Sequence, residues 1–144
     1  MKQTMEVTFN AVIENENFAR SVIAAFITRL DPTIDEMIEV KTIVAEAVSN
    51  AIIHGYDKNP DCEVVMKASI ENELLTIIIQ DYGKGIEDLS KAKVPFYSSL
   101  SSLEHAGMGL PIIESLADSL DIISKINIGT KLIITKQLED HNLG

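Results

Sequence analysis

The chain of 144 residues contains one cysteine, no tryptophan and few basic side chains. Cys62 cannot form a disulfide within the chain, which suits a reducing compartment. Only 12 Lys and Arg side chains accompany 22 Asp and Glu side chains, and the net charge is −10. Because such a charge repels phosphate backbones and no basic stripe offsets it, we do not expect direct binding to nucleic acid.

Long apolar runs are also missing. The run LLTIII at residues 74–79 is far shorter than the roughly 20 residues that a membrane-spanning helix needs. The first residues, MKQTMEVTFNAV, alternate polar and apolar side chains and lack the uninterrupted apolar stretch of a signal peptide. We therefore expect a cytoplasmic protein that has no membrane partner.

What the chain does contain is the composition of a folded domain. Hydrophobic residues make up 46% of it and charged residues 24%, which is the balance of a globular protein. Its length suits one hydrophobic core, so we expect a single domain over residues 1–144.

Hydrophobic periodicity and turn residues predict the elements of this domain. In chain order they are a strand at 5–12, helices at 14–30 and 33–54, strands at 63–71 and 74–81, a helix at 110–118, and strands at 120–126 and 130–138. Phe18 is expected on the apolar stripe of the first helix, and Thr33 with Glu36 resembles a capping box at the start of the second. Residues 95–109 are expected to form a mobile loop and 139–144 a frayed tail. The order predicts an α+β fold: a two-layer sandwich with a mixed, mostly antiparallel sheet and its helices on one face.

The stretch EAVSNAIIHGY, residues 46–56, places polar side chains on one face of the second helix. Glu46, Asn50 and His54 lie four residues apart, and four residues make slightly more than one helical turn. That face could simply meet water. A chemical use is equally open, because asparagine is a mediocre helix former and better ones would serve a solvated face.

Glycines mark the end of the strand at 74–81. In DYGKGI, residues 81–86, Gly83 and Gly85 permit positive φ and a close approach of the backbone to a ligand. Asp81 offers an acceptor pair to a group such as an exocyclic amine. Taken alone, the segment could also be an ordinary Asp-Gly turn.

Two further glycine motifs follow in the chain. GMG at 107–109 leads into a helix, where free N–H groups and the helix dipole can bind an anion. Gly129-Thr130 alone predicts only a hairpin turn. Each of these motifs is weak by itself.

In this order the four motifs resemble the ATP-binding fold shared by gyrase, Hsp90, histidine kinases and MutL. The resemblance implies ATP or ADP and Mg²⁺ as cofactors, with Asp81 on the adenine amine and Asn50 on the metal. It also implies that the loop before Gly109 closes over the phosphates. The other implied nucleotide contacts are Gly83, Gly85, Ile86, His105, Gly107, Met108, Gly109 and Thr130.

At 144 residues we expect room for neither the transducer domains nor the dimerisation helix found elsewhere in that superfamily. The stretches ENENFARS, AAFITRLDPTIDE and EAVSNAIIHGY are similar to the freestanding anti-sigma kinases of spore-forming bacteria. That resemblance implies a homodimer that holds a sporulation sigma factor and uses ATP to phosphorylate a serine of an anti-anti-sigma factor. The alternatives are an anti-sigma kinase of the general stress response and a non-catalytic, nucleotide-gated binding module.

Within this hypothesis Glu46 is the expected general base. Glu16 and Arg20 form either an exposed i,i+4 pair or part of the partner-binding surface. His54 is expected to cap the helix or to pack in the core rather than to act in catalysis. His105 is the only residue of the 95–109 loop that can become cationic, where the family often has lysine or arginine, so the rate of transfer is open.

Overall fold

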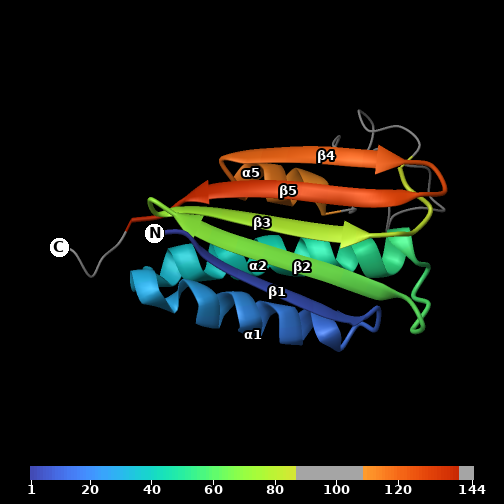
Figure 1. Ribbon diagram of the computed structural model, residues 1–144, viewed down its shortest axis with the longest axis horizontal. Coiled ribbons are helices and arrows are strands. Elements are labelled where there is room, and N and C mark those ends of the chain that lie inside the picture. Colours follow the sequence, from blue (N-terminus) through green and yellow to red (C-terminus); the bar gives the residue numbers. More distant parts are fainter. Residues whose placement is uncertain (87–108, 140–144) are drawn as a thin grey trace.

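A twisted sheet of five strands forms one layer of the molecule (Figure 1). The computed structural model describes residues 1–86 and 109–139. The strands are β1 (Gln3–Asn10), β2 (Glu63–Glu71), β3 (Leu74–Asp81), β4 (Ser119–Lys125) and β5 (Gly129–Gln137). Their order is β1-β2-β3-β5-β4, and every neighbouring pair is antiparallel. β3 therefore lies at the centre of the sheet.

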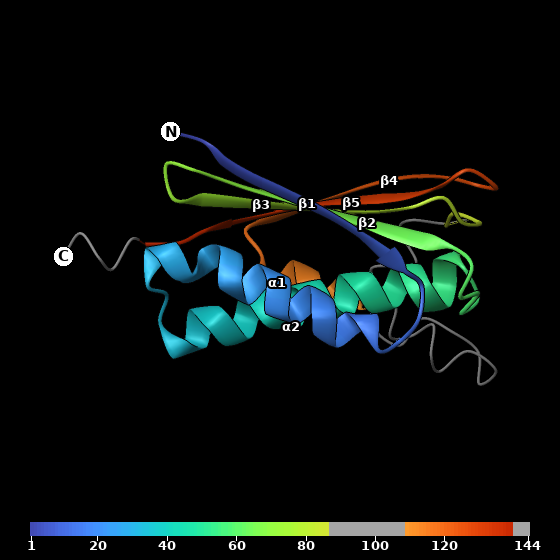
Figure 2. The same cartoon turned by 60° about the horizontal axis from the view of Figure 1, so that its bottom comes forward.

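Helices cover one face of this sheet, as Figure 2 shows edge-on. They are α1 (Asn15–Ile27), α2 (Ile34–Asn50) and α5 (Leu110–Leu116). A 3₁₀ turn, η1 (Thr28–Leu30), follows α1, and a π-helical turn, η2 (Ala51–Gly55), extends α2. α2 packs against both other helices. Within the described residues, no helix is both long enough and apolar enough to cross a membrane.

The core lies between the two layers because the strands alternate. Leu75, Ile77 and Ile79 of β3 point toward the helices and are fully buried, while the residues between them are partly exposed. Ile43 and Val44 of α2 meet them from the helical layer. Burying each such side chain contributes about 1.5–3 kcal/mol, so this contact fixes where α2 lies on the sheet.

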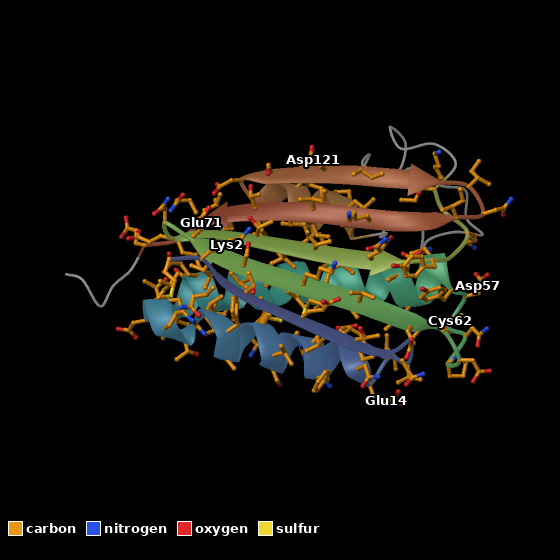
Figure 3. All side chains as sticks on the ribbon, viewed as in Figure 1. Lys2, Glu14, Asp57, Cys62, Glu71 and Asp121 are labelled. Carbon is orange, nitrogen blue, oxygen red and sulfur yellow. The ribbon has the colours of Figure 1, made fainter. Side chains whose placement is uncertain are left out.

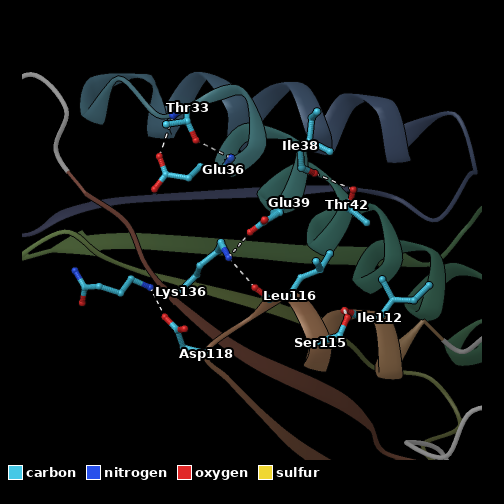
Figure 4. A network of polar contacts seen from close by, with 11 residues as sticks. Thr33, Glu36, Ile38, Glu39, Thr42, Ile112, Ser115, Leu116, Asp118 and Lys136 are labelled. Atoms are coloured by element: carbon cyan, nitrogen blue, oxygen red, sulfur yellow. Dashed lines mark hydrogen bonds and ion pairs between the residues drawn. The ribbon is translucent and has the colours of Figure 1, made fainter.

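Thr33 and Glu36 fix where α2 begins. The Thr33 hydroxyl accepts from the Glu36 N–H at 3.1 Å, and the Glu36 carboxylate accepts from the Thr33 N–H at 2.9 Å (Figure 4). This confirms the predicted capping box, which satisfies two N–H groups that the helix itself leaves free. The start of the helix that carries Glu46 and Asn50 is therefore well defined.

The predicted α+β sandwich with helices on one face is confirmed, although every strand pairing in the described part of the chain is antiparallel. The π-helical turn was not predicted. Phe18, expected in the buried stripe of α1, is 47% exposed and packs edge-on against Phe9 with ring centroids 6.0 Å apart. The expected 95–109 loop, except Gly109, and residues 140–144 of the expected tail lie outside the described residues.

Candidate functional site

Asp81 ends β3 as a buried carboxylate. Asp81 is 3% exposed, and the Gly83 N–H donates a hydrogen bond to its Oδ1 at 2.9 Å. Burial raises the pKa of Asp81 from 3.8 to about 6, although the backbone N–H groups of Gly83 and Thr130 lower it. At neutral pH the site therefore contains a mostly ionised acceptor with little contact with water.

The polar face of α2 and η2 is largely shielded from water. Asn50 is 4% exposed and His54 is 7% exposed, while Glu46 is half-buried. The interpretation of this face as a solvated strip is therefore wrong. The burial of His54 fits the expected core role.

Asn50 has a polar atom that lacks a partner. Its Oδ1 is buried and accepts no hydrogen bond from the described residues. Leaving a buried carbonyl oxygen unpaired costs about 1–3 kcal/mol. An amide oxygen is a ligand type that Mg²⁺ accepts, so the side chain predicted to hold the metal fits that group.

Glu46 lies against Gly109 at the start of α5. A Cβ atom placed on Gly109 would lie 2.5 Å from the Glu46 Oε2 and 2.9 Å from its Cβ, and Gly109 has a φ of 79°. No other residue would fit there without moving the glutamate. Burial raises the pKa of Glu46, and the negative charge of Glu16 on α1 raises it further. A higher pKa makes a carboxylate a better proton acceptor.

Ser124 joins the glycine turn after β3 to Thr130. The Ile86 N–H donates to the Ser124 hydroxyl at 2.8 Å, and the same hydroxyl lies 2.8 Å from the buried hydroxyl of Thr130. Sequence reasoning missed Ser124. Its position on the otherwise apolar inner face of β4, two residues after Ile122, is the feature that could have indicated it.

Only one of the two glycines in the 81–86 turn has the predicted backbone conformation. Gly85 has a φ of 79°, whereas Gly83 does not have positive φ. Gly83 is required for space instead, since a Cβ there would overlap the Gly55 carbonyl group. A Cβ on Gly85 would meet the Lys125 carbonyl group, so both glycines allow close packing.

Arg20 does not pair with Glu16. Its guanidinium donates to the Asn17 side chain, so the exposed i,i+4 ion pair is not found among the described residues. Glu16 is half-buried and close enough to Glu46 to influence its pKa. The predicted partner surface on α1 therefore adjoins the predicted base.

The site is arranged along the end of α2. Asp81 and Thr130 are paired across β3 and β5 near Gly55, and Glu46 and Gly109 meet about two turns earlier in the helix. Asn50 lies between these two ends of the site. His105, Gly107 and Met108 lie outside the described residues.

Comparison with known proteins gives one consistent result. Residues 9–136 match the family described as the histidine kinase-like ATPase domain. The chain is 47% identical to the anti-sigma F factor of Oceanobacillus iheyensis over 96% of this chain and 94% of that protein. The chain is 46% identical to the anti-sigma F factor of Clostridium perfringens, over 96% of this chain and 99% of that protein. It is 44% identical to the anti-sigma F factor of Bacillus subtilis, over 96% of this chain and 94% of that protein.

Solved structures share the fold at low sequence identity. The RsbU and RsbW domains of a Mycobacterium tuberculosis protein align with a TM-score of 0.65 at 18% identity, covering 94% of this chain. The chain spans 32% of that protein's solved chain. The blue-light activated histidine kinase of Erythrobacter litoralis aligns with a TM-score of 0.57 at 19% identity, covering 79% of this chain and 34% of its own.

Proposed function

The chain belongs to the histidine kinase-like ATPase family and resembles its anti-sigma F factors throughout, and on this premise we propose an ATP-dependent protein serine kinase. In this proposal the protein binds and inhibits a sporulation sigma factor and phosphorylates a serine of an anti-anti-sigma factor. We further propose that it acts as a cytoplasmic homodimer.

The unpaired, buried Oδ1 of Asn50 is the observation that carries the proposal. Buried polar atoms that lack a protein partner are rare in folded proteins, and a bound ion is one way in which such an atom is satisfied. In the proposal this oxygen contacts Mg²⁺. When bound, Mg²⁺ neutralises charge on the phosphate oxygens during transfer.

Asp81 and Glu46 have different roles in the proposed reaction. The buried Asp81 carboxylate accepts a hydrogen bond from the exocyclic amine of adenine, which distinguishes ATP from nucleotides that have a carbonyl there. Glu46 accepts the hydroxyl proton of the substrate serine as the serine oxygen bonds to the γ-phosphorus of ATP, and the bond from that phosphorus to the bridging oxygen breaks so that ADP leaves. Its raised pKa and its contact with Gly109 favour this role.

The remaining predicted positions complete the proposed site. Gly83, Gly85, Ile86, Gly109 and Thr130 would form the nucleotide-binding walls from the glycine turns and β5, with His105, Gly107 and Met108 as further contacts. Glu16 and Arg20 would contact the protein partners beside Glu46, so that the substrate serine approaches from the α1 side.

Mass spectrometry tests the proposal directly. The protein is mixed with Mg²⁺, ATP and a candidate anti-anti-sigma factor, and the partner is weighed before and after incubation. We expect the partner to gain one phosphate on a serine, and no gain when ATP or Mg²⁺ is omitted. A partner that binds but never gains phosphate would support the non-catalytic binding module instead.

A further inference from the structure

Residues 55–57, where the chain leaves η2, are held by hydrogen bonds against the turn after β3. The Gly55 carbonyl accepts from the Lys84 N–H at 3.0 Å. The Tyr56 hydroxyl accepts from the Tyr82 N–H at 2.7 Å and donates to the Glu63 carbonyl at 2.7 Å. Each of these bonds joins the 55–57 segment to the end of β3 or the start of β2.

An exposed ion pair adds a fourth contact. Asp57 Oδ1 lies 3.0 Å from Lys84 Nζ, and both side chains are at least half exposed. Asp57 lies at the end of the sheet where β3 finishes, together with Cys62 (Figure 3). Because exposed pairs contribute little, the backbone and the tyrosine hydroxyl carry most of this attachment.

The π-helical turn η2 sets where this segment lies. The Tyr56 N–H donates to the Ala51 carbonyl at 3.0 Å, which closes a five-residue step instead of the four-residue step of an α-helix. Such turns insert an extra residue and are frequent at functional sites. Here the turn ends at the residue that faces Asp81.

Gly55 lies directly against the Asp81 carboxylate. A Cβ on Gly55 would be 2.8 Å from the Cγ, the Oδ1 and the Oδ2 of Asp81. Gly55 does not have positive φ, so its backbone would accept alanine. Glycine is therefore needed at this position to leave space for the Asp81 carboxylate, and not to allow a particular backbone conformation.

We propose that Gly55 and Tyr56 are positioning residues that orient Asp81 toward an adenine base. Because Gly55 has no side chain, it leaves the space that the Asp81 carboxylate occupies. The Tyr56 hydroxyl accepts a hydrogen bond from the backbone N–H of Tyr82, the residue after Asp81, and so holds the backbone next to that carboxylate. This inference rests on the proposed function, because it concerns how the same site recognises its nucleotide.

Gly55→Ala is the sharper test. Alanine favours a helical backbone more than glycine does, so the fold has no reason to weaken except at Asp81. We expect the affinity for ADP, measured by calorimetric titration, to fall by about tenfold or more, which is the scale of one displaced hydrogen-bonding group. The ratio of affinities with and without Mg²⁺ should stay at the parent value, because Asn50 does not move.

Tyr56→Phe provides a second variant that keeps the ring and removes only the hydroxyl. We expect its ADP affinity to fall by about three- to tenfold. Thr33→Ala is the matched control, because it removes the α2 cap about 30 Å from Gly55 along the helix and lowers stability without touching the site. It should bind ADP like the parent.

The outcomes separate the two proposals. A parent protein that does not bind ADP would make the proposed function wrong, and the positioning inference would fall with it. If the parent binds ADP and both Gly55→Ala and Tyr56→Phe bind it equally tightly, only the positioning inference is wrong. An equal loss of affinity in Thr33→Ala would also overturn it, since general destabilisation would then explain the effect.

Discussion

Asp81 is a residue whose proposed function opposes stability. Its pKa in the folded protein, about 6, lies above the ordinary value of 3.8, so the folded state binds the proton more tightly than the unfolded state. The free energy of unfolding therefore falls as the pH rises from about 4 to about 6, and remains lower above that range. The shift in the pKa of Asp81 corresponds to a decrease in the free energy of unfolding of up to about 3 kcal/mol.

Asp81→Asn should therefore stabilise the protein while removing nucleotide binding. At pH 8 we expect the free energy of unfolding to rise by about 1–3 kcal/mol, because the amide carries no buried charge. At pH 3.5 the gain should vanish, since the aspartate is then protonated. Urea unfolding at both pH values measures the effect, and an equal gain at both would show that charge is not its cause.

Asn50→Ala separates metal binding from adenine binding. We expect ADP affinity to fall mainly when Mg²⁺ is present, because the unpaired Oδ1 is the proposed metal ligand. Stability should change by less than about 1 kcal/mol, since the lost packing is offset by removing an unpaired polar atom. Calorimetric titration with and without Mg²⁺ measures this difference, and equal losses in the two titrations would rule out Asn50 as the ligand.

Some site residues could be predicted from the sequence and others could not, for a physical reason. Asn50 and Asp81 are polar residues inside apolar helical and strand patterns, so local spacing identified them. Tyr56 and Ser124 owe their roles to partners 26 and 38 residues away along the chain. Their importance depends on how the helix and the hairpin meet, which local patterns do not contain.

At the scale of elements, Lys136 ties the sheet to two helices (Figure 4). Its Nζ lies 2.7 Å from the Glu39 Oε2 of α2 and donates to the Leu116 carbonyl at 2.7 Å. Leu116 ends α5, where a positive charge is favourable, and the opposite end of α5 contacts Glu46. The lysine side chain is 12% exposed, so this ion pair is screened less than a surface pair.

Lys136→Met should lower the free energy of unfolding by about 1–2 kcal/mol, because it keeps the stem but removes the ion pair and the cap on α5. Lys84→Met is the matched control, since its pair with Asp57 is at least half exposed. It should cost less than about 0.5 kcal/mol. Urea unfolding compares the two variants, and equal losses would mean that Lys136 is no more than a surface charge.

The elements themselves were mostly predictable. Alternation located β2 and β3, and the Thr33 and Glu36 pattern located the start of α2. The π-helical turn could not be predicted, because it depends on the contacts of residues 55–57 with a strand end that follows much later in the chain. The placement of β5 beside β3 is likewise a non-local pairing.

At the scale of the whole molecule, all helices of the described chain lie on one side, and the proposed base and partner residues lie there too (Figure 2). Arg20→Ala should weaken binding of the anti-anti-sigma factor by about tenfold, because a charged hydrogen-bonding group is lost from the interface. ADP affinity should stay unchanged. Surface plasmon resonance and calorimetry test the two expectations, and unchanged partner affinity would remove Arg20 from the proposed surface.

The central claim is that this molecule transfers phosphate with Glu46 as the base, and single-turnover kinetics of Glu46→Gln test it most directly. The parent and the variant are each loaded with ATP and Mg²⁺ and mixed with the anti-anti-sigma factor, and phosphoserine is followed over time. The account predicts parental ATP affinity and transfer slower by about 10²- to 10⁴-fold in the variant. Transfer at the parental rate by Glu46→Gln would contradict it.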